Sequence, residues 1–251
     1  MERLSRSDLQ AILGCLEFAY GEASEEPFPP AVLERFSSLV ACDELSYTEL
    51  DRVRNKVIRG VAYRKDGPEF GPGMETFWRL VHEHPLCAQS VAGRFEALKI
   101  SDVVTTRELR RREIYSEWFQ PWETEHELEV GIPSPRWHTK TLVFGRSKAR
   151  ADFDERDRSV LIALQPHLIQ LYRTATLRQQ LADGSGDDVM AADLTDRERE
   201  VLVLVRAGKT NSQIAGELWI AHGTVRKHLE HIYRKLGVQS RTAAVARLSG
   251  R

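Results

Sequence analysis

The side chains best suited to bind a polyanion lie at residues 224–236 of this 251-residue chain. Apolar residues recur there at the three- and four-residue spacing of a helix with one buried face, namely Val225, Leu229, Ile232 and Leu236. The opposite face must then present charged and polar groups to solvent: Arg226, Lys227, Glu230, His231 and Arg234. Guanidinium and ammonium groups donate to phosphates and guanine edges, and a carboxylate accepts from cytosine N4. The segment therefore predicts a helix that fits the major groove of DNA.

Two further helices are predicted before this segment, at residues 194–208 and 210–218. Thr195 with Glu198, and Thr210 with Gln213, have the spacing of a capping box, in which two side chains three residues apart cap a helix start reciprocally. The third helix lacks such a start, because Ala221 stands at its cap position. We expect this to weaken the cap by roughly 1 kcal/mol unless His222 or Thr224 compensates.

Four blocks of this region carry a family resemblance: LTDREREVL, TNSQIAGEL, GTVRKHLEHIYRKLGV and SRTAAV. In register, they resemble the LuxR-family helix-turn-helix, also called FixJ or GerE, along its full length. The resemblance implies a tetrahelical DNA-binding domain at residues 194–251 whose fourth helix, at residues 241–248, supplies a dimer contact. It also assigns two sets of residues, base-facing Arg226, Lys227 and Glu230, and phosphate-facing Thr224, His228, Lys235 and Arg241.

Two positions depart from the family pattern. Members usually have a hydroxyl residue at Ala221 and often a basic residue at Glu230. We expect Glu230 either to accept from cytosine N4 or to be a solvated acid paired with Arg226 or Arg234, and the sequence leaves both readings open.

Charge and composition fit this assignment. Residues 193–251 carry a net charge of +5 and residues 1–192 a net charge of −6, so the basic charge lies where DNA would be met. There is no apolar run long enough to span a bilayer and no secretory signal, so we expect a cytoplasmic protein without membrane contact. The irregularly spaced Cys15, Cys42 and Cys87 favour reduced thiols.

Residues 1–180 predict an α+β domain, because helical and strand-like segments alternate without a regular repeat. The predicted helices are 7–20 with Ser7 as a candidate N-cap, 30–41, 74–86 ended by Pro85, 105–122, and 154–181. The predicted strands are 46–50, 57–64, 127–132 and 137–146, and residues 94–104 predict a short strand and turn. Residues 181–193 are rich in Gly, Ser and Asp, which predicts a flexible linker.

The stretches FWRLVHEHPL, EVGIP and TLVFGRSKARADFDERDRSVLIALQPHLIQLYR resemble the GAF-like sensory domains that precede LuxR-family DNA-binding units. The resemblance implies a domain that binds a small effector or dimerises. The aromatic and imidazole groups expected near a pocket are Trp78, His84, Trp118, Trp122, Trp137 and His138, although large apolar groups are more often core. A phosphorylated receiver domain is not expected, since the chain opens with helices. An acyl-homoserine-lactone domain is not expected either, because Trp78 is the only tryptophan before residue 118.

The sequence gives little support to the hypothesis of a catalytic or metal-binding site. The chain has no nucleophile elbow, phosphate-cradling glycine loop or HExxH motif, so we expect no enzyme. His82, His84 and Cys87 lack a nearby fourth ligand, so we expect no metal and no cofactor. The sequence thus predicts a homodimeric transcription regulator that binds double-stranded DNA. The alternative is a ligand-binding or scaffold protein whose C-terminal domain mediates protein contacts.

Overall fold

The computed structural model describes residues 3–22, 26–52, 54–64, 73–134, 138–182, 194–206, 208–218 and 220–247. The chain divides into two compact units, Met1–Thr176 and Leu177–Arg251. Most of the predicted linker, at 183–193, lies outside the described residues, and residues 181 and 182 end a helix instead. None of the helices in the described ranges is long and apolar enough to cross a lipid bilayer.

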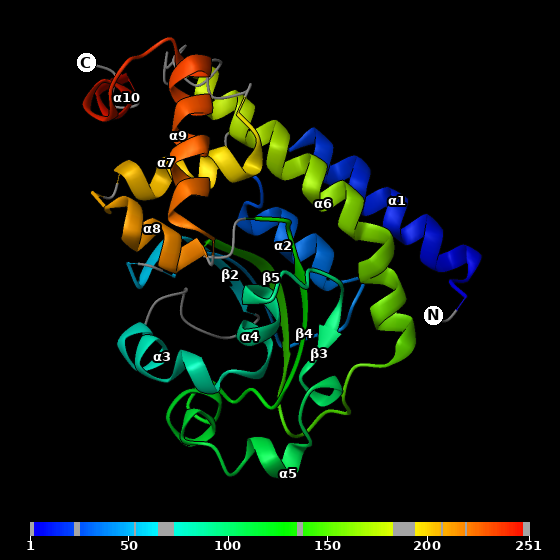
Figure 1. Cartoon of the computed structure of the whole chain (residues 1–251). Coiled ribbons are helices and arrows are strands. Elements are labelled where there is room, and N and C mark those ends of the chain that lie inside the picture. Colours follow the sequence, from blue (N-terminus) through cyan, green and yellow to red (C-terminus); the bar gives the residue numbers. More distant parts are fainter. Residues whose placement is uncertain are drawn as a thin grey trace. The chain divides into compact units, whose positions relative to one another are not determined.

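The first unit is built on one antiparallel sheet of five strands in the order β2-β1-β5-β4-β3. The strands are β1 (Glu44–Asp51), β2 (Lys56–Arg64), β3 (Leu98–Lys99), β4 (His126–Gly131) and β5 (His138–Arg146). Helices lie on both faces of this sheet (Figure 1), and the α+β class is confirmed. The short strand and turn predicted over 94–104 are present as β3 and a 3-10 helix at Ile100–Asp102. The Asp102 carboxylate accepts the Lys99 N–H there at 2.8 Å.

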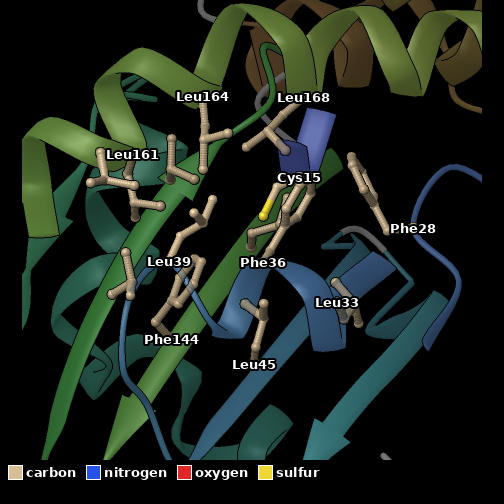
Figure 2. Close-up of a cluster of buried hydrophobic side chains, with 14 of the residues drawn as sticks. Cys15, Phe28, Leu33, Phe36, Leu39, Leu45, Phe144, Leu161, Leu164 and Leu168 are labelled. Atoms are coloured by element: carbon tan, nitrogen blue, oxygen red, sulfur yellow. The ribbon is translucent and has the colours of Figure 1, made fainter. Parts of the chain in front are cut away.

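One face of the sheet packs against helices α1 (Arg6–Gly21), α2 (Pro30–Ser37) and α6 (Glu155–Ala182). Figure 2 shows this core, in which Leu45 and Phe144 from the strands meet Leu161, Leu164 and Leu168 from α6. Leu161, Leu164, Leu168 and Leu171 of α6 are buried, so their spacing marks the stripe that covers a sheet. Cys15 and Cys87 are buried, Cys42 is partly buried, and none of the three forms a disulfide.

Helix α1 differs from its prediction at its start. Its N-cap is Ser5 rather than Ser7, because Ser5 and Asp8 form a capping box with bonds of 2.9 and 3.1 Å. Leu9 and Leu13 lie at helical spacing from the buried apolar residues of the helix, but both are exposed. The helix is rotated so that Ile12, Cys15, Leu16 and Ala19 face the core. A partly uncovered apolar side remains on α1.

The other face of the sheet is covered by short helical segments. These are α3 (Met74–Leu80), a 3-10 helix (Val81–Glu83), α4 (Pro85–Val91), α5 (Thr106–Leu109) and a π-helix (Tyr115–Phe119). Pro85 ends the preceding segment and is also the first residue of α4. Proline suits the first position of a helix, because the backbone N–H that it lacks would have no partner within the helix there. The single amphipathic helix predicted over 105–122 is wrong: Arg112 donates to the Glu83 carbonyl and Arg110 to Glu125, and these tertiary contacts hold the segment in two pieces.

The second unit contains four helices among its described residues: α7 (Asp196–Arg206), α8 (Asn211–Leu218), α9 (His222–Leu236) and α10 (Arg241–Arg247). Both predicted capping boxes are present. The Thr195 N–H donates to Glu198 at 2.8 Å, and the Thr210 N–H donates to Gln213 at 2.8 Å. The predicted four-helix unit is confirmed.

Candidate functional site

The sheet face under the short helices is polar although it is buried. Strand residues alternate between the two faces, so Leu128, Val130, Leu142 and Phe144 enter the apolar core while their neighbours point the other way. Those neighbours include Ser46, Glu127, Glu129, Thr139 and Thr141, all of them buried. Burying a polar sheet face is unfavourable unless its groups find partners. This face is therefore the first place to look for a binding site.

A cavity of about 90 Å³ lies on this polar face, enough for several water molecules. Its floor consists of side chains from four strands, including the hydroxyls of Ser46, Thr48, Thr139 and Thr141. Thr48 and Thr141 share a hydrogen bond of 3.0 Å across β1 and β5. The floor can thus both donate and accept hydrogen bonds.

An aromatic wall faces this floor. Phe77 from α3 lies 5.1 Å, centroid to centroid, from Trp118 of the π-helix, and Trp118 lies 5.7 Å from Trp122. Gly73 precedes α3 in a left-handed conformation, at φ 86°, and a Cβ there would stand 3.4 Å from the Trp118 ring. Glycine at this position therefore lets the start of α3 approach the wall.

The predicted pocket residues fall into three groups. His84, Trp118 and Trp122 line the cavity. Trp78 packs beside Phe77 and His138 points to the other face of the sheet, so the structure does not bring these two to the cavity. The reason for His138 is strand alternation on β5, which turns Thr139 inward and His138 outward. Trp137 lies outside the described residues.

Two glutamates and a histidine form the charged end of the cavity. His84 caps α4, its Nδ1 accepting the Cys87 N–H at 3.4 Å, and its Nε2 lies 3.3 Å from Glu127 Oε2. Glu129 accepts a hydrogen bond of 2.8 Å from Ser90. Burial raises the pKa of Glu129 to about 7, and the Ser90 hydroxyl opposes this shift only in part. Near neutral pH this carboxyl is therefore divided between its two protonation states.

In the second unit, α9 has the two faces that its sequence predicts. Val225, Leu229, Ile232 and Leu236 are buried, whereas Arg226, Lys227, Glu230, His231 and Arg234 are exposed. The Arg226 side chain is 75% exposed and the nearest acid, Glu230, lies 3.8 Å away. An exposed ion pair of this length contributes little, so the guanidinium can exchange it for another acceptor.

Comparison with known proteins agrees with this helical arrangement. Residues 192–248 match GerE, described as bacterial regulatory proteins of the luxR family. The chain carries a LuxR-family domain at its C-terminus. The matched family is one of bacterial regulatory proteins, so the C-terminal domain of the chain is of the regulatory helix-turn-helix type.

Solved structures similar to the chain are distant. Escherichia coli SdiA is 17% identical with a TM-score of 0.39, over 97% of this chain and 95% of that one. The N-acylhomoserine-lactone-dependent LuxR-family factor CepR2 from Burkholderia cenocepacia is 14% identical with a TM-score of 0.46, over 70% and 99%. The GAF domain of an Acinetobacter phosphoenolpyruvate-protein phosphotransferase is 14% identical with a TM-score of 0.46, over 72% and 99%. At this distance the likeness assigns no role to any residue.

Within the LuxR-family domain, the predicted phosphate-facing residues have different surroundings. Lys235 Nζ donates to Glu198 at 2.7 Å, and Arg241 donates to Asn211 at 3.3 Å and to the carbonyls of Val205 and Lys209. Both thus join α9 or α10 to α7 and α8. Burial, aided by nearby Arg197, lowers the pKa of His228, so this ring is neutral at pH 7. Thr224 lies half-buried in the first turn of α9.

Sequence reasoning missed the two cavity glutamates. Glu127 and Glu129 alternate with Leu128 and Val130 on β4, a pattern that ordinarily marks a strand with one solvated face. Here helices cover that polar face. The available signal was a strand with acids on one side, within a domain that has helices enough to cover both sides of its sheet.

Proposed function

We propose that this chain is a sequence-specific transcription regulator that acts in the bacterial cytoplasm, binds DNA as a homodimer, and responds to a small molecule in its first unit. The observation that carries the DNA-binding part is the exposed basic face of α9 opposite its buried apolar face, inside a LuxR-family domain. Arg226, Lys227 and Glu230 read bases in this proposal. Thr224, His228, Lys235 and Arg241 lie toward the phosphates.

Glu230 acts in this proposal as a specificity residue. Free in solution it lies 3.8 Å from Arg226, and this weak pair separates when the helix enters the groove. An acid near the phosphate backbone reduces affinity, whereas one that accepts from cytosine N4 discriminates between base pairs. Replacing it changes which sequences are preferred more than how tightly the best one binds.

Selection of bound duplexes from a random DNA pool, followed by affinity measurements at several salt concentrations, tests the proposal. Affinity for the selected site falls steeply with salt, because phosphate contacts release condensed counterions. The double change Arg226→Ala, Lys227→Ala weakens binding at least about ten-fold, since each base contact is worth about 1–3 kcal/mol.

A matched control removes the same charge elsewhere. Arg107 and Arg111 are exposed in the first unit, and changing both to alanine leaves DNA affinity within about two-fold. Equal losses in the two double variants would mean that total charge, rather than α9, governs binding. No selected sequence and no salt dependence would favour the scaffold reading instead.

The homodimer is supported by the uncovered apolar side of the first unit. Leu9, Leu13 and Tyr20 on α1 and Ile162 on α6 are exposed, and the two helices run side by side (Figure 1). A second copy covers this stripe in the proposal, and a dimer also suits two DNA half-sites one helical turn apart. In sedimentation equilibrium, the double variant Leu9→Ser, Leu13→Ser is then expected to have the molar mass of a monomer.

The control for the dimer is an exposed apolar residue away from this stripe. Ile58 on β2 is 50% exposed, and Ile58→Ser leaves the chain dimeric. A dimer that persists when both α1 leucines are changed would place the contact elsewhere, with α10 as the next candidate.

A further inference from the structure

The cavity in the first unit has an excess of acceptors at one end. Three carboxylates are among the described residues that line it, Glu44, Glu127 and Glu129, and His84 is the one basic side chain in that lining. Glu44 already has a partner, since Arg64 lies 3.4 Å away. The positive charge of Arg52 lowers the pKa of Glu129 slightly against the effect of burial, but Arg52 does not line the cavity. The carboxylates of β4 are thus the groups that a ligand would meet.

Glu127 holds an unused acceptor. The residue is more than nine-tenths buried, and its Oε2 accepts no hydrogen bond from any described group. His84 Nε2 forms an ion pair with this oxygen at 3.3 Å, because burial is outweighed by Cys87 and Glu127, which raise the pKa of His84 well above its ordinary value, but the pair lacks the alignment of a hydrogen bond. A buried carboxylate oxygen without a donor is unfavourable, and such an oxygen in a native structure calls for a donor that arrives from outside.

The aromatic wall faces the same space and accepts cations. Trp118 and Trp122 line the cavity together with Phe77. Trp122 already has one cation beside it, as the Arg64 guanidinium lies 5.4 Å from its ring centroid. A positive group in contact with an indole face gains about 0.5–2 kcal/mol, more as water is excluded.

We propose that the cavity binds a small organic cation, a protonated amine with a flat apolar body, whose ammonium group donates to Glu127 and whose body lies against Trp118 and Trp122. This inference rests on the proposed function only in treating the cavity as the effector site. Glu129, next but one along β4, is the second acceptor for the ammonium group. The hydroxyls of Thr139 and Thr141 provide for further polar groups of the ligand.

A charge series on one molecular body tests this inference. Phenethylamine, 2-phenylethanol and phenylacetate share a phenyl ring and differ in their polar end, which is cationic, neutral and anionic at pH 7. Binding to the full-length chain is measured by calorimetry and by tryptophan fluorescence, because Trp118 and Trp122 line the site. The amine binds at least about ten-fold more tightly than the alcohol, and the anion more weakly than both.

The variant Glu127→Gln keeps the shape of the site and removes its charge. It weakens amine binding at least about ten-fold and alters alcohol binding by less than about two-fold. Glu96→Gln, at an exposed carboxylate paired with Arg94, leaves all three affinities unchanged. Should Glu127→Gln not fold, Glu129→Gln carries the same comparison.

Three results would overturn the inference: equal affinity for amine and alcohol, tightest binding of the anion, or no binding of any of the three. The measurement is made without DNA. A chain that binds the amine but shows no change in DNA affinity would contradict effector control and leave the cation site standing. A chain that binds DNA but none of the probes would contradict the cation site and leave the DNA-binding function standing.

Discussion

Two buried glutamates on one sheet, Glu49 and Glu129, have pKa values moved in opposite directions. Burial opposes the ionisation of both. At Glu49 on β1, contacts from His138 at 3.0 Å and Lys140 at 3.8 Å outweigh burial and lower the pKa to about 2. At Glu129 on β4, burial outweighs the hydrogen bond from Ser90 and raises the pKa to about 7. The carboxylate on the face under α6 is thus surrounded by cationic partners, whereas Glu129 on the cavity face is not.

The difference separates two uses of the same alternating strands. Tyr47 and Tyr172 also donate to Glu49, at 3.2 Å each, so its charge is fully surrounded by the protein. Glu127 and Glu129 lie on the other face, where Glu127 Oε2 accepts no hydrogen bond from a described group. The first face holds the domain together, and the second is the face that we propose as a ligand site.

The largest contrast is expected between neighbours on β5. Phe144→Ala removes a fully buried ring from the α6 core and lowers the free energy of unfolding by about 3–5 kcal/mol. Val143→Ala, which faces the cavity, lowers it by no more than about 1.5 kcal/mol, because the removed methyl groups already border open space. Urea unfolding of the two variants measures both losses in the free energy of unfolding. Equal losses would mean that the cavity face is packed as tightly as the core.

Glu49→Gln tests the completed face. The Glu49 pKa falls from 4.5 to about 2 on folding, so its charge stabilises the protein above pH 4.5, and this is lost as pH falls toward 2. The variant loses about 3 kcal/mol at pH 7 and little at pH 2. Unfolding free energies measured across this range test the point, and a loss independent of pH would contradict it.

Glu129→Gln should show the opposite sign. The Glu129 pKa rises from 4.5 to about 7, so stability is full below pH 4.5 and declines as pH rises through 7. The wild-type chain therefore loses up to about 3 kcal/mol between pH 4.5 and 8 through this group, and the variant does not. Parallel pH profiles for wild type and variant would show that Glu129 is better solvated than its burial indicates.

The smallest effect is expected for Thr141→Val. The Thr141 hydroxyl shares a hydrogen bond with the Thr48 hydroxyl. In the variant, a water molecule in the cavity can take the place of the lost hydroxyl as the partner of Thr48. The free energy of unfolding changes by about 1 kcal/mol or less. Leu142→Ala, one residue along on the other face, serves as the reference, with a loss of about 2–5 kcal/mol. Thermal unfolding ranks the pair, and a reversed ranking would exchange the roles of the two faces.

Elements with strong local signals could be predicted from the sequence. The capping boxes at Thr195 and Thr210 and the apolar stripe of α9 are set by residues within a few positions of each other, and each is found as expected. The alternation of β5 likewise predicts which residues share a face. Such patterns are readable because their cause lies in the segment itself.

The failures concern contacts between distant segments. The predicted helix over 105–122 is divided because Arg112 bonds to the carbonyl of Glu83, a residue far away in sequence. The outward turn of Leu13 on α1 depends on which side of the helix α2 and α6 occupy. The cavity glutamates could not be recognised because an acid on a covered sheet face has the same local pattern as one on a solvated face.

The bare start of α9 has a consequence for local order. No side chain in the described part of the chain caps this helix at Ala221, and only the Ala221 carbonyl accepts from the Thr224 and Val225 N–H groups. Its first turn therefore frays more readily than a capped one, and its amide hydrogens exchange faster with solvent. Fixing that turn against a phosphate group removes conformational freedom. In the DNA complex that we propose, part of the binding entropy is thus the ordering of the first turn of α9.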